Sequence, residues 1–344
     1  MATAHHYLTL PHRRLAASII GAVLIPWSVS QARPVHEQLA VDPQGSVEIV
    51  DVAGSVALSG WDRPEIEVTG TVGDEVDRVE VTTSGGRSVV RVIWRSGTAH
   101  GGGNEAKLTV HVPTKSAVTV TLVSADLALG SLQGSVQLQT VSGDVTGDVG
   151  GDFRASTVSG SVRVTAAAAR RTEVKTVSGT IHVTGSGGEV EISTISGDAT
   201  LDLASITRGR FKSVSGGLTA GFALAADGRF EGESVSGNLE VKFAGTPAAD
   251  FDVQSVSGNI SNCFGPKPKE ARYGPGSRLA FKSGEGSAHV QIETKTGNVS
   301  LCTRESQAKR SADAASASGC GRSPMFNEVD GTEHGDRLRR FPLI

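Results

Sequence analysis

Several residue types that mark common protein classes are scarce in this chain of 344 residues. Aromatic residues make up 4%, and there are two methionines and three cysteines. After residue 32 no apolar run is long enough to cross a bilayer, which predicts no transmembrane segment in the mature chain. The 33 basic and 36 acidic residues are mixed along the sequence. This balance gives no footprint for nucleic acid or for an anionic membrane.

The motifs of metal and phosphate chemistry are also missing. The sequence has no HExxH, no paired CxxC, no GxxxxGK[ST] and none of the nonapeptides that bind calcium in β-rolls. Six histidines after the leader are scattered and form no metal-spaced pair: His36, His100, His111, His182, His289 and His334. We therefore predict no metal, no cofactor and no catalytic residue.

The first 32 residues have the pattern of a secretion signal. His12, Arg13 and Arg14 precede an apolar run from Leu15 to Trp27, and Ser30-Gln31-Ala32 supplies small residues at the cleavage-defining positions. We therefore expect an exported protein that starts at Arg33 and resides in the periplasm or on the outer cell surface.

What the chain does contain is a repeat. The tripeptide Val/Ile-Ser-Gly recurs seven times between Val141 and Gly258, with its serines 17, 19, 18, 19, 21 and 21 residues apart. A nearly fixed short period is the mark of a solenoid whose coils stack on one another. Apolar and polar residues alternate around the tripeptide, as at Val162 and Val164, which predicts strands with one buried face. The sequence thus predicts an all-β, parallel β-helix (β-solenoid), and the uneven spacing of 17–21 residues per coil favours the right-handed form.

The repeated residues around the tripeptide suit structural roles. A hydroxyl residue precedes each Val or Ile, and these hydroxyls should form a buried ladder of side-chain hydrogen bonds: Thr140, Thr157, Thr176, Thr194, Ser213, Ser234 and Ser255. The glycines suit tight corners between strands: Gly143, Gly160, Gly179, Gly197, Gly216, Gly237 and Gly258. A repeat explains seven serines, whereas a nucleophile explains one, so we interpret these residues as structural.

The repeat also sets the domain organisation. Residues 33–122 are expected to form strands that lead into the solenoid, and residues 123–303 its repeats. No linker separates these two parts, which favours one continuous core. Residues 263–278 are predicted to be a Pro/Gly/Lys-containing loop inserted into a late coil, and residues 304–344 a disordered tail.

Two of the three cysteines occupy equivalent places. Cys263 and Cys302 each lie five residues after a corner glycine, Gly258 and Gly297. Equal offsets on neighbouring coils would place them about 4.8 Å apart, within reach of a disulfide, which export would permit. Because an insertion separates the two coils, two unpaired thiols remain the alternative. Cys320 lies in the tail and is predicted to be free.

Several of these segments resemble a known family. Gly60-Trp61-Asp62, the strand that ends at Val112-Pro113, the Ser-Gly-Asp and Ser-Gly-Asn coils and the closing Thr296-Gly297-Asn298-Val299 are similar to bacterial adhesin-like proteins built from β-strand repeats, a family of unknown function. The resemblance covers roughly residues 45–303. It implies an exported β-solenoid of the cell envelope, and it provides no catalytic residues.

Two functions of different classes follow. The favoured one is a non-catalytic, adhesin-like envelope module whose long side binds a protein, peptide or glycan. The alternative is a carbohydrate-active enzyme, similar to polysaccharide lyases or hydrolases, which would need carboxylates or basic residues clustered beside a cleft on one sheet. The residues after each Ser-Gly, from Asp144 to Asn259, are small turn formers rather than a carboxylate column. Self-association through the solenoid ends is a further hypothesis, since uncapped ends expose strand edges.

Overall fold

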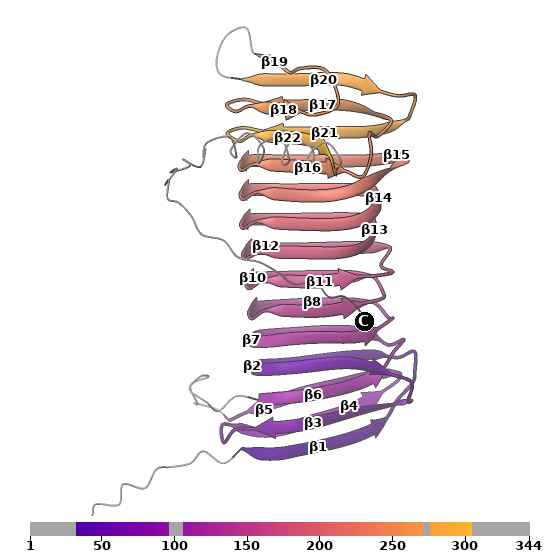
Figure 1. The fold of residues 1–344 in the computed structure, drawn as a ribbon. Coiled ribbons are helices and arrows are strands. Elements are labelled where there is room, and N and C mark those ends of the chain that lie inside the picture. The colour runs from indigo at the N-terminus through magenta and orange to yellow at the C-terminus, as the bar shows by residue number, and fades with distance from the viewer. Residues whose placement is uncertain (1–31, 96–105, 271–275, 305–344) are drawn as a thin grey trace, which may run out of the picture.

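The computed structural model describes residues 32–95, 106–270 and 276–304, and these residues form an all-β structure. Figure 1 shows their strands stacked from β1 (Arg33–Ala40) at one end to β20 (Ser277–Ser283) at the other. Among the described residues no helix has the length and apolarity that a bilayer crossing requires. The predicted signal peptide except Ala32 and the predicted tail except Arg304 lie outside the described residues.

The middle of the stack consists of coils with a strand, a corner and a second strand. The strands before the corners include β8 (Val136–Ser142), β10 (Phe153–Ser159) and β12 (Arg171–Ser178), and those after them include β9 (Val145–Val149) and β11 (Val162–Ala166). Three longer strands continue from one coil into the next: β13 (Ile181–Ser196), β14 (Ala199–Ser215) and β15 (Leu218–Ser236). Parallel pairing places equivalent residues of neighbouring coils beside one another, so that Thr157 lies between Thr140 and Thr176.

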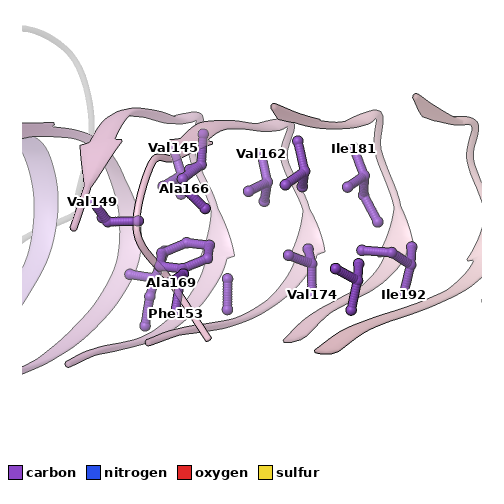
Figure 2. Packing of buried hydrophobic residues seen from close by; sticks show 14 of the residues in the cluster. Val145, Val149, Phe153, Val162, Ala166, Ala169, Val174, Ile181 and Ile192 are labelled. Carbon is purple, nitrogen blue, oxygen red and sulfur yellow. The ribbon is translucent and has the colours of Figure 1, made fainter. Parts of the chain in front are cut away.

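Two facing rows of apolar side chains close the interior. Figure 2 shows Val145, Val162 and Ile181 in one row and Val174 and Ile192 in the opposite row. Each of these side chains is at most 1% exposed. Because full burial of a Val or Ile side chain contributes about 1.5–3 kcal/mol, a coil with several of them is held mainly by its interior. The prediction of an all-β fold with parallel strands is confirmed, and the hand of the coil stays a prediction.

The N-terminal end departs from sequence order. Strand β2 (Ser46–Trp61) lies between β7 (Ala117–Leu132) and a coil made of β5 (Arg87–Trp94) and β6 (Ala106–Pro113). Outside that coil, β3 (Glu65–Val72) and β4 (Val76–Ser84) pair antiparallel with β6 and β5, and β1 pairs antiparallel with β3. Antiparallel strands therefore cover this end of the parallel stack (Figure 1).

The C-terminal end is also built out of order. Strand β21 (Ala288–Thr294) lies between β15 and β17 (Ala249–Ser255), and β22 (Val299–Thr303) lies between β16 (Leu239–Phe243) and β18 (Ile260–Asn262). The last coil in the sequence is thus inserted beneath the coil that precedes it (Figure 1). Strand β20 and the short β19 (Lys269–Glu270) cover the outer side with antiparallel pairing. Within the segment 263–278, predicted to be an inserted loop, residues 269–270 form β19 and residues 277–278 begin β20.

Candidate binding surface

The corner glycines lie where neighbouring coils approach most closely. A Cβ atom at Gly160 would overlap the carbonyl oxygen of Gly143, and one at Gly179 would overlap that of Gly160. The same backbone overlap recurs at all seven predicted corner glycines: Gly143, Gly160, Gly179, Gly197, Gly216, Gly237 and Gly258. Because no side chain fits between the coils there, the glycine of the tripeptide has a structural role.

The hydroxyl residues are buried and stacked in register, but the predicted hydrogen bonds between them are not formed. Six of the hydroxyl oxygens have no hydrogen-bond partner among the described residues: those of Thr157, Thr176, Thr194, Ser213, Ser234 and Thr294. Ser255 donates to the carbonyl oxygen of Gly297 at 2.9 Å, and Thr140 to that of Ser142 at 3.5 Å. Parallel strands hold equivalent atoms about 4.8 Å apart, whereas a hydroxyl hydrogen bond needs about 2.7–2.8 Å. Equivalent rotamers therefore cannot reach one another.

Sequence reasoning omitted one member of this column. Thr294 is 3% exposed and lies in register between Ser234 and Ser255. The sequence feature that could have identified Thr294 is its position directly before Lys295-Thr296-Gly297, the degenerate copy of the tripeptide. The insertion of β21 between β15 and β17 was not visible in the repeat spacing.

A hydrogen-bond ladder does exist, at the residues that follow the corner glycines. The backbone N–H of Ser161 donates to Asp144 Oδ1 at 2.9 Å, that of Gly217 to Asp198 Oδ1 at 2.7 Å, and that of Asn259 to an Asn298 side-chain oxygen at 3.0 Å. Each bond joins one coil to its neighbour. The small residues expected to form turns thus also tie the coils together.

The Val or Ile of the tripeptide faces solvent. Six of these residues, together with Val123 of the preceding Val-Ser-Ala segment, are 41–51% exposed and belong to successive coils: Val123, Val141, Val158, Val177, Ile195, Val214 and Val235. We call these seven side chains the aliphatic edge. Lys295 follows Val235 in the stack and separates it from Val256. An exposed serine follows each member of the aliphatic edge, so the strip carries no charge of its own.

A charged face lies on the outward side of the strands that precede the corners. The buried carboxylate of Glu173 is 2.6 Å from Arg154 Nη2, 2.8 Å from Lys175 Nζ and 3.4 Å from Arg171 Nη2. Burial alone would raise the pKa of Glu173, but the hydrogen bond and charge of Lys175, together with Arg154 and Arg171, outweigh it and lower that pKa.

Next to Glu173 the charged face is hollowed. A hollow of about 260 Å³ is lined by side chains of β12 to β15: Arg171, Glu189, Val190, Glu191, Arg208, Arg210, Arg229 and Glu231. We call this the arginine hollow. Arg210 donates two hydrogen bonds to Glu231 Oε2, at 3.1 and 2.7 Å, and this contact raises the pKa of Arg210. In the described part of the chain no group of histidine, cysteine, aspartate and glutamate is arranged to hold a metal ion.

Cys263 and Cys302 are joined by a disulfide, with their Cα atoms 4.8 Å apart. Cys263 follows β18 directly, and Cys302 belongs to β22, the parallel neighbour of β18. The bond therefore links the inserted last coil to the coil outside it. Cys320 lies outside the described residues.

The architecture defines an all-β protein of stacked parallel coils with antiparallel ends. Residues 56–302 match the Toastrack DUF4097 family, so the chain belongs to this family. The resemblance to bacterial adhesin-like repeat proteins is thereby confirmed. No curated protein matches the sequence.

The solved structures that match this chain share little sequence with it. A candidate lipid-binding protein from Parabacteroides distasonis is 11% identical, with a TM-score of 0.44, over 78% of this chain and 98% of that chain. A candidate adhesin from Bacteroides fragilis is 12% identical, with a TM-score of 0.37, over 79% and 97% of the two chains. Values this low carry no inference about function.

Proposed function

We propose that this protein is an exported, non-catalytic binding module of the cell envelope, adhesin-like in that one long side of the stack contacts a partner. The observation that carries the proposal is the aliphatic edge. Its seven residues are each about half exposed and adjoin one another in successive coils, and contiguous apolar patches on the surface of a monomer are often functional.

The rest of the repeated motif has a role inside the stack. The residue before the Val or Ile is buried, the glycine lies against the next coil, and the residue after the glycine often bonds to it. The Val or Ile is large, apolar and exposed, although a polar residue of similar shape would serve a corner as well. Contact with a partner accounts for this choice in seven successive coils.

Cross-linking in intact cells tests the proposed surface. A photoreactive residue replaces Val177, in the middle of the aliphatic edge, or Arg163, an exposed residue of β11 that serves as the control. We expect a discrete cross-linked product in the envelope fraction from position 177 and none from position 163. The double variant Val158→Thr and Ile195→Thr keeps the β-branched shapes and should abolish the product. Equal products from positions 177 and 163, or recovery of the protein in the cytoplasm, would contradict the proposal.

A carbohydrate-active enzyme is the second candidate, because the arginine hollow does gather basic and acidic side chains on one sheet. Its three carboxylates are each paired with a guanidinium: Glu189 at 3.2 Å and Glu191 at 3.3 Å with Arg171, and Glu231 at 2.7 Å with Arg210. A carboxyl that acts as general acid or base must exchange a proton with its substrate, and here a cation occupies that place. This pairing favours binding over catalysis.

Incubation of the purified protein with acidic polysaccharides distinguishes the two candidates. We expect the polymers to keep their length, with no unsaturated or shortened sugars released. Product formation that depends on Glu189, Glu191 or Glu231 would replace the binding module with an enzyme.

A further inference from the structure

Opposite charges face each other across neighbouring coils over most of the charged face. Arg154 pairs with Glu173 at 2.6 Å, Arg210 with Glu231 at 2.7 Å, and Lys212 with Glu233 at 3.0 Å. In each pair the two residues are partners in the parallel register. Such cross-strand pairs are favourable, whereas like charges directly opposite one another are unfavourable.

Among the described strands, three register pairs break this pattern: the acidic pairs Glu173/Glu191 and Glu233/Glu293, and the basic pair Arg208/Arg229. The two arginines of the basic pair face each other in register between β14 and β15. Each forms one long ion pair, Arg208 with Glu189 at 3.9 Å and Arg229 with Glu231 at 3.8 Å, and the side chains are 68% and 57% exposed. Within the described ranges neither guanidinium donates a hydrogen bond to another residue. His289 is the next residue in this row, so no acid follows Arg229.

Both arginines line the arginine hollow. Four guanidiniums and three carboxylates surround it, which leaves one excess positive charge in a protein whose sequence is net negative. Its 260 Å³ is less than the roughly 300–1,000 Å³ of pockets that enclose a drug-sized ligand. The hollow therefore fits one charged unit of a longer molecule, and the open sheet around it leaves room for the rest.

We propose that Arg208 and Arg229 bind an oxyanion, a carboxylate or a phosphate, carried by an acidic polysaccharide. Guanidinium groups match oxyanions in a bidentate geometry, and charge-assisted hydrogen bonds of this kind are among the strongest. An anion between the two side chains replaces their mutual repulsion with attraction to both. The site rests on the proposed binding function but uses a different surface from the aliphatic edge. The experiment on each surface can therefore support or contradict its own proposal without deciding the other.

The surroundings of the two arginines select the kind of polymer. Glu189 and Glu231 stand beside them and disfavour a ligand with closely spaced charges. The same carboxylates accept hydrogen bonds from sugar hydroxyls. The site lies on a sheet face rather than at a strand edge, so it offers no backbone ladder for an extended peptide. Widely spaced charges on a chain rich in hydroxyls are the mark of an acidic polysaccharide.

Binding measurements with three polymers test this site on the exported chain. We expect wild-type protein to bind polygalacturonate or phosphorylated dextran, with affinity falling as salt rises, and not to bind unmodified dextran. The charged polymer that binds identifies the oxyanion as carboxylate or phosphate. The double variant Arg208→Gln and Arg229→Gln should weaken binding at least tenfold, whereas Arg163→Gln should not change it. Wild-type protein that binds neither charged polymer at low salt, or a double variant with full affinity, overturns the site.

A measurement on wild-type protein makes the test independent of variant folding. An arginine-directed reagent such as phenylglyoxal modifies exposed guanidiniums, and mass spectrometry reads each position. Bound galacturonate oligomers or phosphorylated dextran should protect Arg208 and Arg229 but not Arg163. Equal modification of all three in the presence of a bound polymer would place the anion elsewhere. If the aliphatic edge fails its own test while this protection holds, the oxyanion site stands alone.

Discussion

In the middle of the stack each coil lies beside its neighbour in sequence, whereas at both ends the coils are out of order. Strand β2 separates the β5–β6 coil from β7 at one end, and the β21–β22 coil separates β15–β16 from β17–β18 at the other. Nearest-neighbour contacts define the middle, as in other solenoids. The ends need pairing between distant segments, which also closes the stack with antiparallel strands.

The two ends are held by different means. Two features hold the C-terminal end, the disulfide and a cluster of six phenylalanines. The ring centroids of contacting phenylalanines lie 4.6–6.3 Å apart: Phe222, Phe230, Phe243, Phe251, Phe264 and Phe281. The N-terminal end instead buries a carboxylate. Asp51 is 1% exposed and faces Leu122, one coil before the hydroxyl column begins. One end is cross-linked, and the other contains a group whose charge opposes burial.

The largest effect is expected in the middle, where every coil depends on its neighbours. Gly179→Ala places a Cβ against the carbonyl oxygen of Gly160, at a backbone φ of +154°. Neither coil can move without displacing the next, so we expect a loss of about 4–5 kcal/mol in the free energy of unfolding, the range of the most severe single substitutions. Denaturant unfolding followed by circular dichroism measures it.

The matched control is Gly245→Ala, at a site where a Cβ meets no atom within 4 Å. We expect a change within about 0.5 kcal/mol there. A similar small change at Gly179 would show that the coils are less tightly stacked than the structure has them.

The second effect belongs to the C-terminal end alone. The double variant Cys263→Ser and Cys302→Ser opens a loop with a sequence separation of 39 residues. Loop-closure entropy for that length corresponds to about 4 kcal/mol. Hydrogen exchange should show faster exchange in β17, β18, β21 and β22 and unchanged exchange in β8 to β12. A uniform increase along the chain, or none, would contradict a role confined to the inserted coil.

The third effect tests the N-terminal end. Burial raises the pKa of Asp51 from 3.8 to about 6, although hydrogen bonds with the backbone of Val52 and Ala53 and with Trp94 oppose the shift. The folded state therefore binds the proton more tightly than the unfolded state does. Protonation of Asp51 therefore stabilises the folded state. This contribution to the free energy of unfolding is full below about pH 4 and is lost as the pH rises to about 6, and it amounts to at most about 3 kcal/mol.

Asp51→Asn removes this dependence. We expect the variant to be more stable than wild type above pH 6, with the difference shrinking as the pH falls to 4. Unfolding in urea at several pH values measures the difference in stability between variant and wild type. The other carboxylates contribute equally to both proteins, so their effect drops out of this difference. A difference that does not change with pH would show that Asp51 titrates normally.

The repeat predicted the middle of the fold well, because a period of 17–21 residues fixes which residues stack. The inward positions, such as Val174 and Ile192, followed from alternation alone. The hydroxyl of each Thr-Val step was predicted to be buried, but alternation did not show that the Val or Ile beside it is exposed, so the aliphatic edge was not predicted. Nor does a period reveal that a later coil inserts beneath an earlier one. The arginine hollow arises from four successive coils, and the sequence showed its charges only as a mixed face.

The smallest effect compares the middle of the hydroxyl column with its end. Thr176 buries a hydroxyl without a partner, whereas Ser255 donates to Gly297 at 2.9 Å. Thr176→Val keeps the shape and removes an unpaired polar atom, so we expect a gain of about 1 kcal/mol in the free energy of unfolding. Ser255→Ala removes a made hydrogen bond, and we expect a loss of about 1 kcal/mol. Opposite signs in denaturant unfolding would show that the column is held by shape in the middle and by hydrogen bonding at its C-terminal end. A loss at Thr176 as large as that at Ser255 would instead mean that the hydroxyls bond along the whole stack.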